Sequence, residues 1–191
     1  MSYTKYVTPE QYLREEAVAY EKHEYFDGHV IAMAGATESH NRIVRNLVGE
    51  LHGFLKGKTC EVFPSDIRVA TPFSNSYTYP DVTIVCGDTE MKEEGFDTLT
   101  NPSVIIEVTS PSTRDIDLGP KMWKYLQIPS LKEYIIIDST TYNARTIRRA
   151  TDNTYELTNV DGPDGSIRIN TIGLQLSFTD IYYKVTFEEN H

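Results

Sequence analysis

The sequence is poor in cysteine and has no long apolar run. Its 191 residues include only two cysteines, Cys60 and Cys86, too few for the disulfide framework of a small secreted domain. Their number suits a reducing cytoplasm. The N-terminal residues lack the apolar segment of a signal peptide, and no run approaches the roughly 18–20 apolar residues of a membrane helix. These absences predict a cytoplasmic protein without a membrane partner.

Basic residues are also scarce: 18 Lys and Arg stand against 28 Asp and Glu, giving a net charge of −10. This balance argues against nucleic-acid binding, because such binding requires basic side chains to neutralise phosphates. The charge is uneven, however. The net charge is −7 over residues 1–100, +2 over residues 101–150 and −5 over residues 151–191. A basic surface would have to come from the middle segment.

The remaining composition is that of an ordinary folded protein, with 39% apolar and 24% charged residues. A chain of this length can bury roughly 70% of the surface that it exposes when unfolded. We therefore expect residues 1–191 to form a single domain with a sizeable core.

The spacing of apolar residues predicts alternating helices and strands. Helices are expected at residues 8–20, 39–56 and 117–127, with a last helical turn at 178–185. A hairpin is expected at residues 23–33, with Asp27-Gly28 as its turn. Further strands are expected at residues 60–70, 79–86, 103–109, 132–138, 142–150, 154–160, 165–169 and 173–177. This order predicts a mixed α/β (α+β) fold that ends in a β-rich extension.

Several common functional motifs are absent or misplaced. Residues 53–59 (GFLKGKT) resemble a phosphate-binding loop, but they have one residue too few between the glycines and follow a helix, not a strand. The sequence has no Cys-x-x-Cys or His-Glu-x-x-His motif for zinc. Ser110, Ser112 and Thr113 fit a strand-to-helix turn better than a set of nucleophiles. A surface position is the simplest reading of His23, His29, His40 and His52.

Two carboxylates stand beside strands that are apolar on both faces. Residues 103–109 contain Glu107, and residues 79–86 contain Asp81. A carboxylate at such a position needs a partner or a metal, because burying an unpaired charge is costly. Two adjacent strands could direct both groups at one hard cation. The structural alternative is that Asp81 simply begins its strand and that Glu107 is in a salt bridge.

Two lysines follow on the next predicted helix. Lys121 lies after Gly119-Pro120, at the start of this helix and close in the chain to the end of strand 103–109. Lys124 is more simply read as part of a solvated helix face.

These residues, taken together, resemble the Uma-type family of restriction endonucleases, within the PD-(D/E)XK nuclease superfamily. The similar stretches are 24–28 (EYFDG), 32–35 (AMAG), 40–41 (HN), 64–69 (PSDIRV), 80–82 (PDV), 106–113 (IEVTSPST), the set Asp117, Gly119, Lys121 and Tyr125, and 132–138 (KEYIIID). The resemblance covers about residues 8–150, which leaves residues 151–191 as the extension.

The resemblance implies a restriction-endonuclease-like core, with a mixed sheet flanked by helices, and Mg²⁺-dependent (or Mn²⁺-dependent) phosphodiester hydrolysis. It implies that Asp81 and Glu107 hold the metal, with the Val108 carbonyl as a further ligand. The usual superfamily lysine, two residues after the glutamate, is Thr109 here; Lys121 is the matching residue on the following helix. Its role would be to orient the attacking water or stabilise the transition state.

Three more positions match the family motifs. Glu24 and His40 could complete the site around the metal, whereas Asp66 could equally be a capping or pairing residue. The leading interpretation is thus a metal-dependent endonuclease acting on nucleic acid, with DNA as the expected substrate. The alternatives are a catalytically silent binding module on the same fold and a hydrolase of another phosphate ester.

Two expectations concern surfaces. A homodimer is expected, since cutting both strands of a duplex requires two sites. The apolar residues of the extension could supply its interface or cover a sheet of their own chain: Ile167, Ile169, Ile172, Leu174, Leu176 and Phe178. Any basic surface should be built from Arg114, Lys121, Lys124, Arg145, Arg148 and Arg149.

Overall fold

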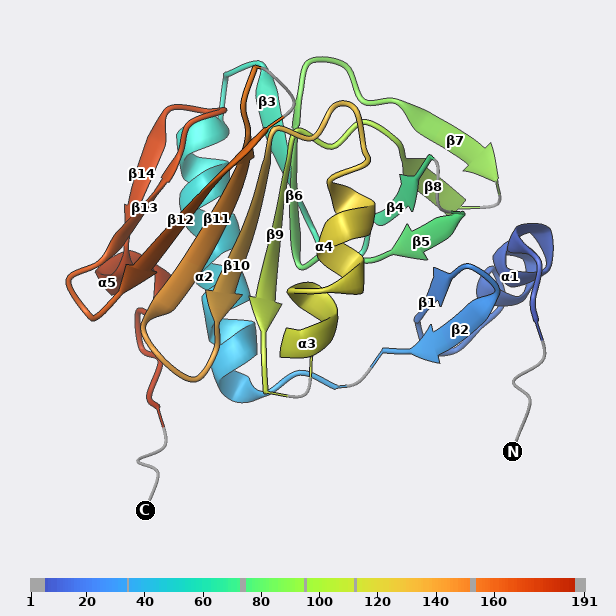
Figure 1. Cartoon of the computed structure of the whole chain (residues 1–191), viewed down its shortest axis with the longest axis horizontal. Helices are drawn as coiled ribbons and strands as arrows, with labels where there is room; N and C mark the ends of the chain where they lie inside the picture. Colours follow the sequence, from blue (N-terminus) through green and yellow to red (C-terminus); the bar gives the residue numbers. More distant parts are fainter. Residues whose placement is uncertain are drawn as a thin grey trace.

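The structure, a computed structural model, describes residues 6–33, 35–72, 75–94, 96–111, 113–151 and 154–187. Within these residues, two six-stranded sheets lie side by side and a two-stranded hairpin packs at the C-terminal end (Figure 1). Ala34 and Ser112, both part of the family motifs, lie outside the described residues.

The central sheet has the strand order β12-β11-β10-β9-β6-β3. Its strands β9 and β10 are parallel, and its other neighbours are antiparallel. The bounds are β3 Cys60–Pro64, β6 Val82–Cys86, β9 Val104–Thr109, β10 Glu133–Asp138, β11 Asn143–Arg149 and β12 Tyr155–Asp161.

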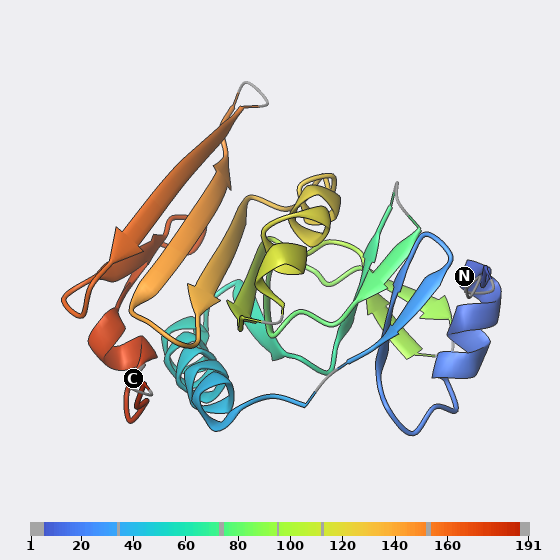
Figure 2. The ribbon, with the colours of Figure 1, turned by 60° about the horizontal axis from the view of Figure 1, so that its bottom comes forward.

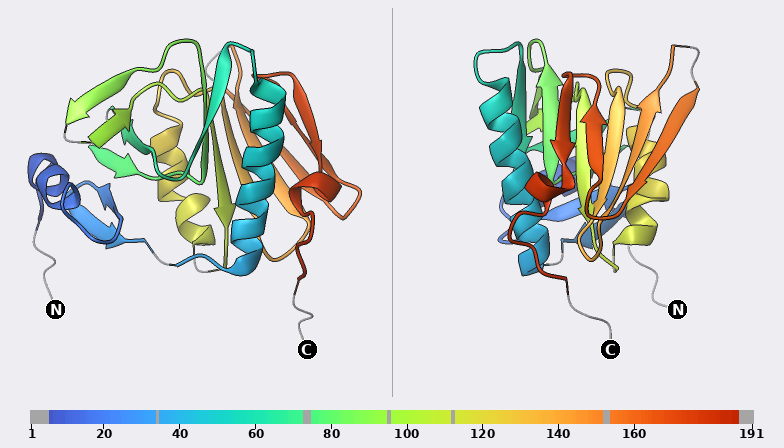
Figure 3. Two further views of the ribbon diagram at one scale, coloured as in Figure 1. Left: turned by 180° about the vertical axis from the view of Figure 1, so that it is seen from behind. Right: turned by 90° about the vertical axis from the view of Figure 1, so that its left-hand side faces the viewer.

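Helices cover both faces of the central sheet. Helix α2 (Glu38–Leu55) lies on one face, and the short helices α3 (Arg114–Asp117) and α4 (Pro120–Tyr125) lie on the other (Figure 3). The predicted apolar face of α2, with Ile43, Leu47, Leu51 and Leu55, is buried. Alternate residues of β9 enter the two cores: Ile106 packs on the α2 side and Ile105 on the α4 side. The predicted two-sided burial of this strand is thereby confirmed.

The second sheet has the order β2-β1-β5-β4-β8-β7 and is flanked by helix α1 (Pro9–Glu16) (Figure 2). Asp27 and Gly28 form the predicted hairpin turn with φ values of 45° and 94°, a left-handed conformation that glycine and aspartate tolerate best. The bounds are β1 His23–Phe26, β2 His29–Ala32, β4 Arg68–Thr71, β5 Ser76–Thr78, β7 Met91–Glu94 and β8 Phe96–Leu99.

The C-terminal extension folds back onto the central sheet. It supplies β12, the edge strand of that sheet, and then forms β13 (Ser166–Ile169), β14 (Leu174–Ser177) and α5 (Phe178–Ile181). Its apolar side chains, including Ile167, Leu176 and Phe178, join the core that contains α2. Of the two roles expected for them, they cover a sheet face of their own chain.

Several element boundaries differ from the sequence predictions. Residues 60–70 form two strands in different sheets, because a turn at 65–67 separates β3 from β4. Residues 117–127 contribute to two short helices, with Pro120 at the start of the second, where its missing N–H costs least. Helix α1 is capped by Thr8 as predicted but ends at Glu16. Strands β7 and β8 were not predicted, since residues 90–99 show no period-two pattern.

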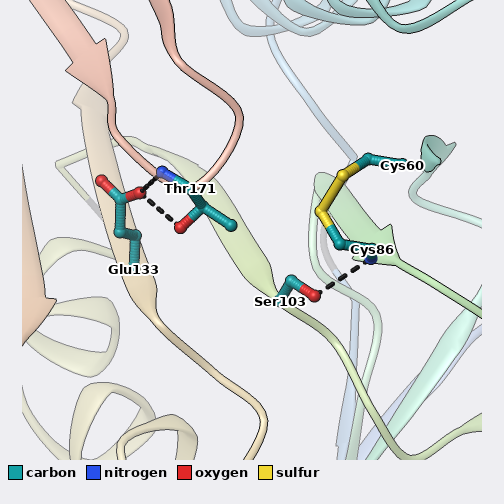
Figure 4. The surroundings of a disulfide bond; sticks show 5 residues. All are labelled: Cys60, Cys86, Ser103, Glu133 and Thr171. Carbon is teal, nitrogen blue, oxygen red and sulfur yellow. Dashed lines mark hydrogen bonds between the residues drawn. A yellow bond between two sulfur atoms is a disulfide. The ribbon is translucent and has the colours of Figure 1, made fainter. Parts of the chain in front are cut away.

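A disulfide joins Cys60 to Cys86 (Figure 4). The two residues are direct partners in the antiparallel pairing of β3 with β6, and their Cα atoms are 4.0 Å apart. Sequence reasoning did not anticipate this bond, because only the strand register brings together two cysteines that are 26 residues apart.

Candidate active site

The two sheets lie next to each other (Figures 1 and 2). The predicted site residues, which come from both sheets and from two helices, lie within contact distance of one another. They arrive from five segments: Glu24 from β1, His40 from α2, Asp81 from the residue before β6, Glu107 from β9 and Lys121 from α4. Pro80-Asp81 lies between β5 of one sheet and β6 of the other, so that Asp81 stands at the crossing.

Asp81 is held by contacts on one carboxylate oxygen. Its Oδ2 accepts a hydrogen bond from the Val108 backbone N–H at 2.8 Å and lies 3.2 Å from His40 Nε2. The Asp81 backbone N–H points to Glu107 Oε2 at 3.4 Å. Asp81, Glu107 and the backbone of Val108 are therefore immediate neighbours.

Lys121 lies between two carboxylates. Its Nζ is 2.9 Å from Glu107 Oε1 and 2.9 Å from Glu24 Oε1, and 3.8 Å from Asp117 Oδ1. The Lys121 side chain is 8% exposed and that of Glu107 5% exposed. Lys121 thus points into the interior, although it lies on a helix that also has solvent-exposed positions.

Tyr125, one helical turn after Lys121, completes this set of contacts. Its hydroxyl donates to Glu107 Oε1 at 2.8 Å and lies 3.0 Å from Thr78 Oγ1. Tyr125 was named from the sequence only as part of the family motif and was given no role. The spacing of four from Lys121 to Tyr125, which puts both on one helix face, was the signal that could have paired it with the lysine.

The electrostatics of this cluster are unusual. Burial raises the pKa of Glu107 to about 8, against the opposing effect of Lys121 and with the help of the neighbouring carboxylates Asp81, Asp117 and Glu24. Burial alone would lower the pKa of Lys121, but the carboxylates outweigh it and hold that pKa well above its usual value. Lys121 is therefore a permanent cation beside a carboxyl group that titrates near neutral pH, an arrangement that clusters at functional sites.

The donor set fits a hard divalent cation in its chemistry. Asp81 and Glu107 offer carboxylate oxygens on adjacent strands, and a cation would relieve their mutual repulsion. Among the residues that the structure describes, no group of three or more His, Cys, Asp or Glu side chains is arranged as a metal site. The other ligands would thus be a backbone carbonyl and water, as Mg²⁺ commonly accepts.

Other candidate residues lie elsewhere or are differently engaged. Asp66 is 83% exposed and pairs with Lys22, outside the carboxylate cluster. Thr109 is buried, with its hydroxyl 3.2 Å from that of Thr113. Lys124 does not lie on a solvated face: it is 14% exposed and bonds Asp27 at 2.5 Å.

The six side chains expected to build a basic surface each have a partner within the molecule. Arg114 pairs with Asp138, and Arg145 donates to the side chain of Asn159. Arg149 donates to the carbonyl oxygens of Leu126 and Ile128. The remaining cations pair with carboxylates: Lys121 with Glu24 and Glu107, Lys124 with Asp27, and Arg148 with Glu133 and Glu156. The proposed basic segment therefore has few cations free for phosphates.

The chain was compared with known proteins. The family profile described as Uma2, "Putative restriction endonuclease", matches residues 9–179. Two Synechocystis sp. proteins are similar: slr1290 is 33% identical over 95% of this chain and 94% of its own length, and sll1609 is 35% identical over 87% and 94%.

The fold has a solved counterpart as well. A crystal structure from Anabaena variabilis, described as a "putative nuclease belonging to DUF820", matches with a TM-score of 0.75 at 19% identity, over 92% of this chain and 97% of the other. It shares the mixed α/β architecture of sheets flanked by helices, as the sequence predicted. Because the family profile spans both sheets and reaches the C-terminal extension, the chain belongs to the Uma2 family of restriction-endonuclease-like proteins.

Proposed function

We propose that this protein is a metal-dependent endonuclease that hydrolyses phosphodiester bonds in DNA. The observation that carries the proposal is the convergence of Asp81, Glu107 and a buried Lys121 at the junction of the two sheets. A scaffold has no need to collect three carboxylates within 4 Å of one buried lysine, since such a cluster costs desolvation energy.

Asp81, Glu107 and the Val108 carbonyl would hold Mg²⁺ or Mn²⁺. When bound there, the ion supplies a water of lowered pKa and neutralises charge on the phosphoryl oxygens. Lys121 keeps its proton and places an ammonium group beside Glu107, where it orients the water or stabilises the developing charge. Tyr125 fixes Glu107, and His40 fixes the Asp81 carboxylate, each through one hydrogen bond.

The experiment that tests this function is a cleavage assay on plasmid DNA and on labelled oligonucleotides, with Mg²⁺ or Mn²⁺. Asp81→Asn and Glu107→Gln should abolish cleavage. Asp164→Asn is the control, because Asp164 is an exposed carboxylate between β12 and β13 and takes no part in the cluster. Cleavage by the Asp81→Asn and Glu107→Gln variants at the wild-type rate would refute the assignment.

The substrate must bind a protein of net charge −10 whose central cations have internal partners. We therefore expect weak binding that depends on the divalent ion and varies little with salt, with a slope near −0.9 per phosphate contacted. Fluorescence anisotropy with DNA and RNA in Ca²⁺ measures this slope and compares the two substrates. A slope of roughly −6 or steeper would require a larger basic footprint than the one described.

A second candidate function is a catalytically silent binding module. The observation in its favour is that Lys121 already neutralises Glu24 and Glu107, so that the cluster could be closed to a metal. Calorimetric titration with Mg²⁺ and Mn²⁺ separates the two functions. Heat of binding that is lost in Asp81→Ala supports the enzyme, and its absence in the wild type supports the module.

Two further parts of the proposal concern assembly and location. We propose a homodimer, because duplex cleavage needs two sites; light scattering should give twice the monomer mass of 21.8 kDa. The extension is already used within its own chain, so another surface must form the contact.

A cytoplasmic location is proposed too. Among the described residues, the structure contains no helix with the length and apolar character of a membrane span. Thiol titration of protein isolated from cells tests this location against the disulfide of the structure.

A further inference from the structure

A cavity of about 620 Å³ lies beside the active site and is not used by the mechanism above. It opens between the segment that follows α1, residues 17–22, and the connection from β3 to β4. Its volume falls within the range of roughly 300–1,000 Å³ that is typical of small-molecule sites. It is therefore large enough to hold a single planar ring system.

The walls of the cavity are largely apolar and partly aromatic. Phe63 and Tyr79 contribute rings, Tyr20 stands fully exposed at the rim, and Ile67 and Met91 add aliphatic surface. Aromatic side chains of this kind stack with nucleobases, because every base has an extended π face.

The cavity also has polar groups of both kinds. Glu16, whose side chain is 4% exposed, accepts hydrogen bonds from the Tyr79 hydroxyl at 3.1 Å and from the His23 backbone N–H at 2.9 Å. Arg68 is 1% exposed and donates to the Thr98 hydroxyl at 2.9 and 2.7 Å. Glu16 and Arg68, both held by protein partners, thus give one wall a carboxylate and a guanidinium next to the edge of a bound base, which presents both N–H groups and carbonyl oxygens.

The charge of the cavity favours a base over a phosphate. Three carboxylates line it, from Glu16, Glu21 and Asp66, against the two cations Lys22 and Arg68. This lining has no positive excess to attract an anion, whereas a neutral heterocycle with donors and acceptors is compatible with it.

The cavity is connected to the active site through single residues. Tyr79 donates its backbone N–H to Glu24 Oε1 at 3.2 Å, while its hydroxyl lies in the cavity wall on Glu16. Asp81 follows two residues later, within about 7 Å along an extended chain. A nucleotide adjacent to the cleaved phosphate could therefore reach the cavity.

We infer that this cavity binds a nucleobase of the substrate strand, turned out of the base stack beside the phosphodiester that is cleaved. The inference rests on the proposed nuclease function for the identity of the strand. Burial and the neighbouring Glu16 raise the pKa of Tyr79, so its hydroxyl stays protonated and continues to hold the Glu16 carboxylate. Unstacking of a base next to the reacting group is a known route to base selectivity in enzymes acting on nucleic acid.

The first test measures the cavity without metal. Nucleoside 5′-monophosphates and ribose 5-phosphate are titrated by saturation-transfer NMR in EDTA, where no cleavage occurs. At least one nucleotide should bind and ribose 5-phosphate should not. Ala19→Trp, which puts a large ring into the cavity, should weaken nucleotide binding by about tenfold or more, the scale of one lost stacking contact. The neighbouring Val18→Trp is the matched control, since Val18 is 86% exposed and does not line the cavity.

A second variant keeps the inference testable if Ala19→Trp fails to fold. Glu16→Gln preserves the shape of the wall and should change the order of preference among the four nucleotides. Equal binding of ribose 5-phosphate and the nucleotides, or wild-type binding and preference in both variants, would overturn the inference.

A third measurement identifies the source of the base. Anisotropy in Ca²⁺ compares a single-stranded oligonucleotide with a series that carries one abasic site at each position in turn. One abasic position should weaken binding to the wild type and have no effect in Ala19→Trp. If mononucleotides bind but no abasic position matters, the strand assignment is overturned. Cleavage without nucleotide binding would refute the cavity alone, and nucleotide binding without cleavage would refute the proposed function alone.

Discussion

Two buried glutamates on neighbouring parallel strands have very different surroundings. Glu133 of β10 is 1% exposed and accepts hydrogen bonds from the backbone N–H and the hydroxyl of Thr171, both at 2.5 Å (Figure 4). It also accepts one from the Asn170 N–H at 3.2 Å. Arg148 adds a cationic partner at 3.4 Å. Glu107 of β9 is equally buried but shares one lysine with two other carboxylates.

The difference shows how a structural charge can be told from a functional one. Hydrogen-bond donors surround Glu133, and the bonds from Asn170 and Thr171 tie the C-terminal extension to the central sheet. Glu107 meets more negative than positive charge, and its pKa is raised to about 8. A buried carboxylate that is matched by hydrogen-bond donors and a cation, such as Glu133, stabilises the fold. A buried carboxylate with too little positive charge around it, such as Glu107, leaves a site that a cation can complete.

The largest expected effect is on catalysis at Lys121. Lys121→Ala should lower the cleavage rate by about 10²–10³-fold, as expected for the loss of a transition-state contact, while leaving metal affinity nearly intact. Lys124→Ala on the same helix is the control and should act mildly, because Lys124 bonds Asp27 instead. Equal rates for wild type and Lys121→Ala would place the catalytic cation elsewhere.

Next in size is the effect on stability at Glu133. Glu133→Gln should lower the free energy of unfolding by about 2–4 kcal/mol, since charged hydrogen bonds are lost and Arg148 keeps only its exposed partner Glu156. Glu107→Gln in metal-free protein above about pH 8, where Glu107 is ionised, should cost less or should stabilise, because it removes a repelling charge. Urea unfolding measures the free energy of unfolding of both variants. A larger loss of stability in Glu107→Gln than in Glu133→Gln would contradict the difference proposed between the two glutamates.

Metal binding should separate the two glutamates again. Millimolar Mg²⁺ or Mn²⁺ should raise the melting temperature of the wild type, by the equivalent of about 2.7 kcal/mol at a hundredfold excess over Kd. The rise should persist in Glu133→Gln and vanish in Asp81→Asn and Glu107→Gln. If the metal raises the melting temperature of Asp81→Asn and Glu107→Gln as much as that of the wild type, it does not bind at this cluster.

The last comparison is a pH dependence. The folded protein keeps a proton on Glu107 up to about pH 8, whereas the unfolded chain releases it near the ordinary value of 4.5. The folded state therefore binds more protons in this window, so metal-free stability should fall as the pH rises from about 5 to about 8. Glu107→Gln should show a smaller fall in denaturant titrations. A wild-type slope equal to that of the variant would contradict the raised pKa.

Much of the site followed from the sequence. The cost of burying Glu107 in a strand that is apolar on both faces pointed to a special partner, and the structure supplies Lys121, Asp81 and Tyr125 around it. The position of Glu24 could not be derived in this way, because it depends on the pairing of β1 with β5, about fifty residues away. The cavity could not be predicted from the sequence either, because its walls come from elements that are distant in the chain: α1, β3, β4 and β7.

Long-range pairings also govern the fold. The sequence predicts a single strand where β3 and β4 occur. In the structure, the turn at 65–67 separates them and each strand belongs to a different sheet. The pairing of Cys60 with Cys86 likewise depends on register. Periodicity reports which face of an element is apolar, but it does not report which other element covers that face.

The assembly of the site from distant segments has a consequence for the order in which the chain folds. Glu24 and Asp81 precede Lys121 by 97 and 40 residues, and the parallel pairing of β9 with β10 needs the crossover through α3 and α4. Contacts of such high sequence separation form late, because loop-closure entropy opposes them. A nascent chain that ends before α4 contains Glu24, Asp81 and Glu107 but not Lys121. For the proposed nuclease, hydrolysis would therefore require a chain that extends through α4, because a shorter chain lacks the lysine assigned to the reaction.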